Sequence, residues 1–302
     1  MKDFEGRVAF ITGGASGIGF GQALVFGGLG CRIAIADVRQ DALDDAVVRL
    51  AAAGIDALPV RLDIRDRAAW EHAADDVEAH FGAPVSLLFN TAGVNGFGAL
   101  ESATYADFDW VMGVNFQGVV NGIVTLLPRM LADGGGGHIV SVASMAGFQG
   151  SPAAAIYAAS KAAVINLMES YALTLPAQGI GVSLLCPASA RTDIAKALDR
   201  RPADLSGKSS FTEDPRFIAL QQQLYSGGME PVELAHHVRS AIEDERFWVL
   251  PFTETREGLR AYFEGILAAY DDYDTDPAAA QARADAFEVY RDQAAALRAD
   301  VR

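Results

Sequence analysis

The pentapeptide YAASK at 157–161 places a phenol and an amine on one face of an expected helix, because Tyr157 and Lys161 are four residues apart. A free tyrosine has a pKa near 10, so a phenol that acts as a base near neutrality needs a shift of roughly three units, or about 4 kcal/mol. An ammonium group about 4 Å away supplies about that much at an effective dielectric constant near 20. The pair is therefore a candidate for proton transfer, although many helices carry this spacing by chance.

Two further polar residues are candidates to act with that pair. Ser144 ends the apolar run HIVSVAS thirteen residues before Tyr157, and Asn115 lies in GVNFQG on a long expected helix. Side chains at the carboxyl end of a parallel strand reach the sheet edge where ligands bind. Ser141 competes with Ser144, but it lies three residues earlier, inside the run. We therefore expect Ser144 to be the reactive serine.

The segment VAFITGGASGIGFGQAL reads as a strand, a glycine turn and a helix in immediate succession. Gly13, Gly17 and Gly19 match the pattern in which glycines let the backbone approach a pyrophosphate at a helix N-terminus. The context of strand and helix is what this dinucleotide motif requires. The alternative is a tight turn that binds no ligand.

Asp37 ends the next apolar run, RIAIAD, about 20 residues beyond the glycine turn. A carboxylate there accepts hydrogen bonds from both hydroxyls of an adenosine ribose and repels a 2′-phosphate. The sequence therefore predicts NAD(H) rather than NADP(H). Arg39 lies nearby and is able to meet a phosphate, and an exposed carboxylate without a ligand is the plainer alternative.

Polar and small residues also end the third and fourth expected strands. Asp63 closes VRLDI, and FNTAGVNG brings Asn90, Ala92 and Gly93 to the end of its strand. Asp63 is placed to hold an adenine amino group, and the small residues at 90–93 would let a cofactor pass close to the backbone. Ordinary turn chemistry explains each of them equally well when taken alone.

Short β-branched runs alternate with alanine-rich segments of helical spacing along most of the chain. The runs are RVAFIT, RIAIAD, ALPVRLD, VSLLFN, HIVSVAS, IGVSLLCP and RFWVLPF, and helices are expected near 17–28, 40–53, 66–80, 104–131, 153–177 and 231–243. This alternation predicts an α/β fold with a doubly wound, seven-stranded parallel sheet covered by helices on both faces.

The composition limits the class of protein. The chain has 302 residues, 51% of them hydrophobic, so it can bury a sizeable core. A formal charge of −15 repels phosphate backbones and anionic lipids, which argues against nucleic acid and membrane partners. The start, MKDFEGRVAF, lacks the apolar core of a signal peptide, and no apolar run approaches the ~20 residues of a membrane span. We therefore expect a cytoplasmic protein.

Cysteine and histidine give no sign of a disulfide or a metal site. Cys31 and Cys186 each lie in an apolar run, where a small buried side chain is the usual interpretation. The five histidines are scattered, and no acidic or sulfur partner recurs at ligand spacing.

No linker or internal repeat divides the chain, so one catalytic domain over 1–302 is expected. The polar, weakly periodic segment 193–230 is predicted to be a substrate lid, with a tolerated surface loop as the alternative. Residues 255–302 are predicted to be a C-terminal helical extension, in which Asp276 and Pro277 begin the last helix. This extension would pack either on its own sheet or on a partner subunit.

The pieces TGGASGIG, NTAG, Asn115, Ser144 and YAASK stand in the order and spacing of the short-chain dehydrogenase/reductase family, which the chain resembles over about residues 3–255. The resemblance implies a Rossmann-type fold and an enzyme that interconverts a secondary alcohol and a ketone with NAD. It also implies a small-molecule substrate, no metal, and a homodimer or homotetramer.

Each matching residue inherits an implied role. Tyr157 would be the acid/base, Lys161 would lower its pKa and hold the nicotinamide ribose, Ser144 would bind the substrate oxygen, and Asn115 would anchor a water in the proton relay. The implied cofactor contacts are Thr12, Gly13, Ser16, Gly17, Ile18, Gly19, Asp37, Arg39, Asp63, Ile64, Asn90, Ala92, Gly93, Tyr157, Lys161, Pro187 and Thr192. Candidate substrate contacts are Val94, Ser144, Met145, Phe148, Tyr157 and residues of the 193–230 lid, with ordinary core packing as the alternative for Met145 and Phe148.

One segment departs from the family pattern. The family usually has Pro-Gly after the sixth strand, whereas CPASARTDI has Ala188 in the glycine position. Thr192 still matches the residue that would bind the nicotinamide carboxamide.

Segments outside the catalytic motifs look closest to the Cα-dehydrogenases that oxidise the benzylic alcohol of lignin-type β-aryl ether dimers. These segments are MKDFEGRVAFITGGASGIGFGQALVFG, FNTAGVNGFG, TYADFDWVMGVN and REGLRAYFEGIL. An aryl alcohol needs a largely apolar pocket with a few polar anchors. The alternatives are a carbonyl reductase of ketosteroids, acyl chains or small ketones, and a dinucleotide-sensing protein without turnover.

Overall fold

The computed structural model describes residues 1–205, 211, 216, 219, 223, 225, 227–270 and 276–299. The chain divides into two compact units, Met1–Thr253 and Glu254–Arg302. The second unit begins one residue before the expected helical extension at 255, where the sequence analysis had expected one domain over 1–302. Much of the predicted lid at 193–230 lies outside the described residues.

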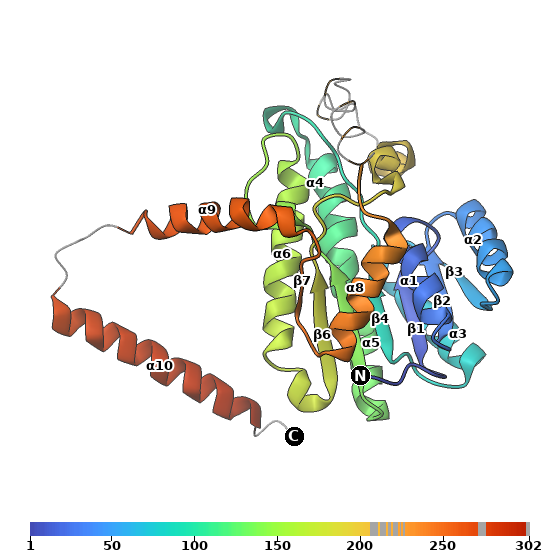
Figure 1. The fold of residues 1–302 in the computed structure, drawn as a ribbon, viewed down its shortest axis with the longest axis horizontal. Coiled ribbons are helices and arrows are strands. Elements are labelled where there is room, and N and C mark those ends of the chain that lie inside the picture. The colour runs from blue at the N-terminus through green and yellow to red at the C-terminus, as the bar shows by residue number, and fades with distance from the viewer. Residues whose placement is uncertain are drawn as a thin grey trace. The chain divides into compact units, whose positions relative to one another are not determined.

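Seven parallel strands form one sheet in the first unit, which confirms the predicted fold (Figure 1). The strands are β1 (Val8–Thr12), β2 (Arg32–Asp37), β3 (Ala57–Arg61), β4 (Leu87–Asn90), β5 (Gly137–Val142), β6 (Ile180–Leu185) and β7 (Trp248–Val249). Their order is β3-β2-β1-β4-β5-β6-β7. The chain winds outward in one direction from β1 and in the other from β4, so a ligand cleft is expected where these two strands end.

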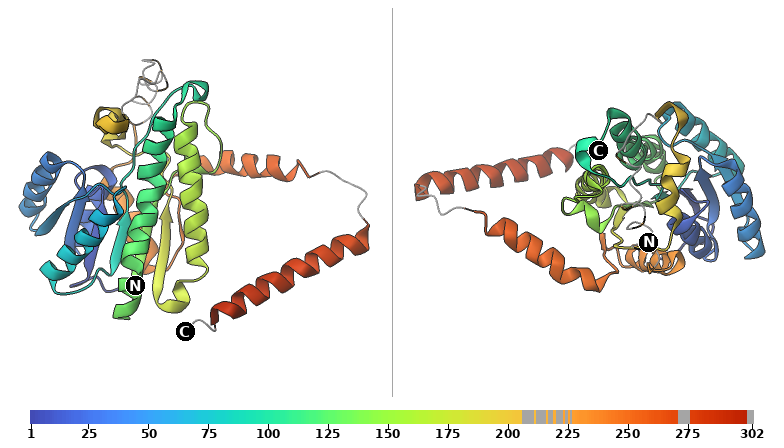
Figure 2. Two further views of the ribbon diagram at one scale, coloured as in Figure 1. Left: turned by 180° about the vertical axis from the view of Figure 1, so that it is seen from behind. Right: turned by 90° about the horizontal axis from the view of Figure 1, so that it is seen from above.

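Helices cover both faces of the sheet (Figures 1 and 2). One face packs against α1 (Gly17–Gly27), α2 (Gln40–Ala52) and α8 (Pro231–Glu243), and the other against α3 (Arg67–Phe81), α5 (Gly118–Asp133) and α6 (Ala155–Ala172). A shorter helix, α4 (Tyr105–Met112), packs against α6. The sheet is therefore buried on both sides, as its nearly continuous apolar strands require.

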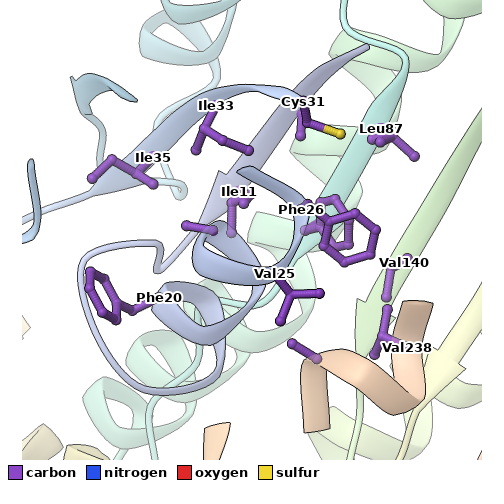
Figure 3. Close-up of a cluster of buried hydrophobic side chains, with 14 of the residues drawn as sticks. Ile11, Phe20, Val25, Phe26, Cys31, Ile33, Ile35, Leu87, Val140 and Val238 are labelled. Carbon is purple, nitrogen blue, oxygen red and sulfur yellow. The ribbon is translucent and has the colours of Figure 1, made fainter. Parts of the chain in front are cut away.

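Neighbouring residues of β1 supply the two cores, because side chains alternate across a strand. Ile11 faces the core that α1 and α8 close, where the ring of Phe26 lies 4.7 Å from that of Phe89 (Figure 3). Phe10 faces the opposite core, where its ring lies 5.3 Å from that of Trp70 on α3. All of these side chains are fully buried.

A π-helical turn interrupts the long helix that the sequence predicts over 104–131. Residues Gly113–Gln117 form this turn between α4 and α5. By length and composition alone, the whole stretch Tyr105–Asp133 would also suit a membrane span, which the sequence analysis did not anticipate. Because 56% of its most apolar window is buried inside the protein, it serves as a core helix of the α/β unit.

The C-terminal unit consists of α9 (Arg256–Leu267) and α10 (Pro277–Ala299). No residue of α9 is buried. Large apolar side chains are exposed on or beside both helices: Phe263, Ile266, Leu267, Tyr270, Phe287, Val289 and Tyr290. The predicted helices are therefore present, and these apolar side chains are exposed among the described residues.

A buried histidine lies at the amino end of the sheet, opposite the ligand edge. His138 of β5 lies 2.9 Å from the Ser183 hydroxyl, which itself donates to the carbonyl of Arg246 at 2.7 Å. The ring nitrogen Nε2 must therefore carry the hydrogen in the neutral ring, because the serine hydrogen is already used. Burial, with a smaller contribution from the N-terminal ammonium, lowers the pKa of His138 to about 3.

This histidine should make the protein less stable as the pH falls. The pKa of His138 in the folded protein lies below the value of about 6.5 expected in the unfolded chain. The contribution of His138 to the free energy of unfolding is therefore complete above pH 6.5 and is lost as the pH falls toward 3. Between pH 7.5 and 5 the loss should be about 2 kcal/mol, measurable by urea unfolding at a series of pH values. His138→Gln should flatten this slope, whereas His72→Gln on the exposed face of α3 should keep it. An unchanged slope in His138→Gln would contradict the assignment.

Candidate active site

A cleft opens at the carboxyl ends of the central strands, and its walls come from segments far apart in sequence. The glycine turn after β1, the ends of β2 and β3, the turn after β4 and the residues after β5 and β6 all line it. The start of α6 adds Tyr157 and Lys161. The cleft therefore lies at the strand crossing point that the topology predicts.

Thr12 and Asn90 support the cleft from beneath rather than line it. The Thr12 hydroxyl donates to the Phe89 carbonyl at 3.1 Å and accepts from the amides of Thr91 at 2.9 Å and Ala92 at 3.1 Å. The Asn90 amide nitrogen donates to the Ser141 hydroxyl at 3.2 Å. Both residues were predicted to contact the cofactor, but both are buried and absent from the cleft lining.

The glycine turn fits a ligand that needs close approach to the backbone. Gly13 has a φ of +63°, and a Cβ atom there would lie 2.9 Å from the Cα of Ala92. Gly17 has a φ of +52°, and its Cβ would lie 2.9 Å from the Thr192 side chain. A Cβ on Gly19 would lie only 2.3 Å from the Gly13 carbonyl. Side chains at these positions would clash with the protein itself, so this tight turn, which exposes its backbone to the cleft, requires glycine.

The N-terminus of α1 faces this turn without a competing anion. Ser16 precedes the helix, but its side chain makes no capping hydrogen bond, and no acidic residue lies in the first turn. Amides at a helix start lack partners within the helix and favour an anion. Ser16 and Ile18 both line the cleft, as predicted for cofactor contacts.

Asp37 and Arg39 form a pair at the ribose end of the cleft. One Asp37 carboxylate oxygen accepts from the Arg39 amide at 3.1 Å and from its Nε at 3.3 Å. Arg39 also donates to the Ser16 hydroxyl at 3.4 Å. Arg200 lines the cleft as well, and burial followed by the nearby charge of Arg39 lowers its pKa. Two guanidinium groups therefore lie close to the Asp37 carboxylate.

Asp63 lies at the predicted adenine position, but an arginine occupies part of it. Arg65 donates to Asp63 through its backbone amide and through Nε, both at 3.0 Å, and through a terminal nitrogen at 2.6 Å. Burial raises the pKa of Asp63, but the Arg65 hydrogen bonds outweigh burial and hold it below its usual value. Asp63, Ile64 and Arg65 all line the cleft.

Ser144, Tyr157 and Lys161 converge at the other end of the cleft. The Ser144 hydroxyl accepts from the Ala146 amide at 3.1 Å and donates to the Pro187 carbonyl at 3.4 Å, and it lies close enough to Tyr157 to lower the pKa of that phenol. The Lys161 amine donates to the Val142 carbonyl at 2.8 Å and lies 5.6 Å from the centre of the Tyr157 ring. All three side chains are more than nine-tenths buried.

Burial controls the protonation of this group and reverses the direction that the sequence argument gave. Desolvation raises the pKa of Tyr157, and the Ser144 hydrogen bond offsets only part of that increase. Desolvation also lowers the pKa of Lys161 to about 8. The amine donates to the Val142 carbonyl, and burial outweighs any stabilisation of a phenolate by its charge. Tyr157 therefore keeps its proton near neutrality when the cleft contains no further positive charge.

Asn115 lies in the π-helical turn and holds the loop beyond β4. Its carbonyl oxygen accepts from the Val94 amide at 2.8 Å, and its amide nitrogen donates to the Val94 carbonyl at 2.9 Å and to Ser160 at 3.0 Å. Ser141 is fully buried between Asn90 and the sulfur of Met168 and does not line the cleft, whereas Ser144 does.

The substrate end differs from the predicted set of contacts. Val94 lines the cleft, but Met145 packs in the core and the Phe148 ring lies 5.6 Å from Trp248. Other side chains take their place: Pro202 and Tyr225, which lie in the predicted lid at 193–230, and Trp110 and Val114, which the sequence analysis missed. Nothing in the apolar periodicity distinguishes Trp110 and Val114 from ordinary core, so no sequence signal would have found them.

A buried ion pair holds one of these walls. Arg201 donates to the Asp107 carboxylate at 2.5 Å, and its guanidinium lies 5.3 Å from the centre of the Trp110 ring. This contact joins the segment after β6 to α4. The same segment brings Pro187, Ala188 and Thr192 to the cleft, so the alanine in the usual glycine position leaves the lining intact.

Replacing Gly13 by alanine should weaken dinucleotide binding through the clash with Ala92. Gly13→Ala should raise the Kd for NADH at least tenfold and cost about 1–2 kcal/mol of stability, because an L-residue is strained at this φ. Gly54→Ala is a matched control, since its φ is +78° and no atom lies within 4 Å of the added Cβ. It should lose similar stability and keep the NADH affinity. Fluorescence titration would measure the NADH affinity, and urea unfolding would measure the stability. Equal NADH affinities in the two variants would contradict a role of the glycine turn in binding the dinucleotide.

The comparisons with known proteins agree with this geometry. A family model described as short chain dehydrogenase matches residues 7–203. The chain is 49% identical over 286 residues to the C alpha-dehydrogenase of Sphingobium sp. (strain NBRC 103272 / SYK-6), with 95% of this chain and 93% of that protein covered.

Two solved structures are also similar. The apo form of LigD from Sphingobium sp. strain SYK-6 has a TM-score of 0.76 and 45% identity, covering 90% of this chain and all (100%) of that one. A short chain dehydrogenase/reductase from Burkholderia phymatum in complex with NAD has a TM-score of 0.84 and 36% identity, covering 91% and 99%. These likenesses agree with the seven-stranded sheet and the glycine turn after β1. The chain therefore belongs to the short-chain dehydrogenase family.

Proposed function

We propose that this chain is an NAD-dependent dehydrogenase that oxidises the benzylic secondary alcohol of an aryl compound, such as a β-aryl ether dimer, to a ketone. The observation that carries the proposal is the convergence of Ser144, Tyr157 and Lys161 in the cleft that the glycine turn also lines. A phenol, a hydroxyl and an amine at the far end of a dinucleotide site are suited to removing a proton while a hydride leaves.

The proton moves through the side chains at the reacting end of the cleft. Ser144 donates a hydrogen bond to the alcohol oxygen, and the Tyr157 oxygen, once deprotonated, takes the alcohol proton as the Cα–H bond breaks and the C=O bond forms. A bound oxidised nicotinamide supplies the hydride acceptor and a positive charge. Lys161, with a pKa near 8, is able to pass on a proton near neutrality.

Deprotonation of Tyr157 is the demanding step in this scheme, because burial opposes a phenolate. A positive charge at the same end of the cleft lowers the free-energy cost of forming the phenolate. Asn115 acts here as a support for Val94 and Ser160, since both ends of its amide are engaged by protein atoms. A water-anchoring role for Asn115 stays a prediction.

Two observations support an aryl substrate. The walls near Tyr157 are apolar, with Val94, Trp110 and Val114 among them. The 49% identical relative is named a C alpha-dehydrogenase, and the likeness covers 95% of this chain. Together they favour an aromatic alcohol over a ketosteroid or acyl chain.

The cellular setting and the assembly follow from the same proposal. We expect a cytoplasmic enzyme, because both cysteines are free thiols. We also expect a homodimer or homotetramer, since the exposed apolar side chains of α9 and α10 favour association.

Tyr157→Phe should remove turnover while leaving the cofactor site intact. Loss of the phenol that takes the alcohol proton should lower kcat roughly 10²- to 10⁴-fold for every alcohol oxidised. NADH binding, followed by fluorescence, should change little. Tyr171→Phe, on the same helix and outside the cleft, is the control and should keep both properties. A Tyr157→Phe enzyme with full activity would remove the phenol from its role.

Asp37→Ser should shift cofactor preference toward NADP(H). The carboxylate repels a 2′-phosphate, and its removal leaves Arg39 and Arg200 free to bind one. The ratio of kcat/KM for NAD⁺ to that for NADP⁺ should fall at least tenfold, which corresponds to about 1.4 kcal/mol. Steady-state kinetics with both cofactors gives the ratio. Asp56→Ser, remote from the cleft, should leave it unchanged.

A further inference from the structure

The substrate end of the cleft contains a second phenol besides Tyr157. Tyr225 lines the cleft among apolar neighbours that include Trp110, Val114 and Pro202. It lies close enough to Tyr157 for the two to interact electrostatically, since Tyr225 contributes to the raised pKa of Tyr157. The reaction as described uses only one phenol, so the second requires an explanation.

A buried asparagine orients the Tyr225 hydroxyl. The Asn95 amide nitrogen donates to the Tyr225 oxygen at 3.4 Å, and only 1% of Asn95 is exposed. The other polar atom of Asn95, its carbonyl oxygen, is buried and has no hydrogen-bond partner in the described part of the chain. Asn95 follows Val94, which Asn115 holds through two hydrogen bonds. Asn115 therefore supports the pair of Asn95 and Tyr225 through Val94.

The hydrogen of the Tyr225 hydroxyl remains available. An amide nitrogen only donates, so the phenol oxygen is the acceptor in its contact with Asn95. Among the described residues, the structure gives no acceptor for the hydroxyl hydrogen itself. Burial raises the pKa of Tyr225, so the phenol keeps this hydrogen across the neutral range. A neutral donor thus lies in the cleft lining, together with apolar side chains and Tyr157.

We propose that Tyr225, oriented by Asn95, is a specificity-determining residue that donates a hydrogen bond to a second oxygen atom of the substrate. The inference rests on the proposed function, because it concerns the same aryl alcohol. The preferred substrates are aryl carbinols with an ether or hydroxyl oxygen on the neighbouring carbon. A benzylic alcohol without that oxygen leaves the donor unsatisfied in a desolvated site and is bound less well.

Two substrates that differ in this oxygen test the proposal. The test measures kcat/KM with NAD⁺ for 2-phenoxy-1-phenylethanol and for 1-phenylethanol, and takes the ratio of the two. In Tyr225→Phe this ratio should fall roughly tenfold, chiefly through a higher KM for the ether, since the bond forms in the ground state and the transition state alike. Tyr105→Phe, a 91% exposed tyrosine on α4, is the matched control and should keep the ratio.

Asn95→Asp provides a second variant with the phenol still present. A carboxylate only accepts, so it should capture the Tyr225 hydrogen and lower the ratio as Tyr225→Phe does. Any effect of the added charge on Tyr157 would slow both substrates and cancel in the ratio. This variant also covers the case in which Tyr225→Phe fails to fold.

The outcomes separate this inference from the proposed function. If the wild-type enzyme oxidises neither alcohol, the aryl-alcohol function itself is wrong. If it oxidises the ether and both variants keep the wild-type ratio, only the role of Tyr225 is overturned. An equal fall for both substrates would mean a structural role, and a raised Kd for NADH in Tyr225→Phe would place the hydroxyl on the cofactor; each of these also overturns the proposal.

Discussion

The Thr12 hydroxyl joins the two halves of the sheet where their strands have stopped pairing. The ladder between β1 and β4 ends at Ile11 and Phe89, and the next contact across the gap is the Thr12 side chain, which bonds to one carbonyl and two amides of the opposite segment. This fixes the distance between the glycine turn and Ala92. The cleft exists because the chain diverges here, and it keeps its shape because one side chain bridges the divergence.

Desolvation sets the chemistry in the rest of the cleft. Burial favours the neutral forms of Tyr157 and Lys161, but near neutrality only the phenol is neutral, because a pKa of about 8 leaves most of the amine protonated. Positive charge brought in by a ligand changes that balance. The Tyr157 phenol thus ionises near neutrality only when such a ligand fills the cleft.

The sequence predicted the fold and a set of residues that meet at one end of the cleft, because both depend on local signals. Strand and helix alternation gave the seven-stranded sheet, and the spacing of Ser144, Tyr157 and Lys161 marked residues that meet at one end of the cleft. The direction in which each side chain points, and the residues that support the cleft from beneath, were harder to predict. Thr12 and Asn90 carry cleft-forming motifs but point inward, and the Lys161 amine turns to a carbonyl. Such choices depend on partners from other elements, which a one-dimensional pattern does not specify.

The substrate wall was the least predictable part for the same reason. Trp110 and Tyr225 occupy positions that look like core or loop in the sequence, and they reach the cleft only through tertiary contacts such as those of Arg201 and Asn95. Met145 and Phe148 follow Ser144 closely in the chain, yet they turn toward the core instead.

The π-helical turn at Gly113–Gln117 has a consequence for how this chain can vary in length. A π turn contains one residue more than the α-helical path, so losing a residue there would give a regular helix and would rotate everything before it by about 100°. Trp110 would then leave the pocket wall and Asp107 would lose its place beside Arg201, while Asn121 and the rest of α5 stayed in place. The pocket wall of this chain therefore depends on the number of residues between Trp110 and Asn121.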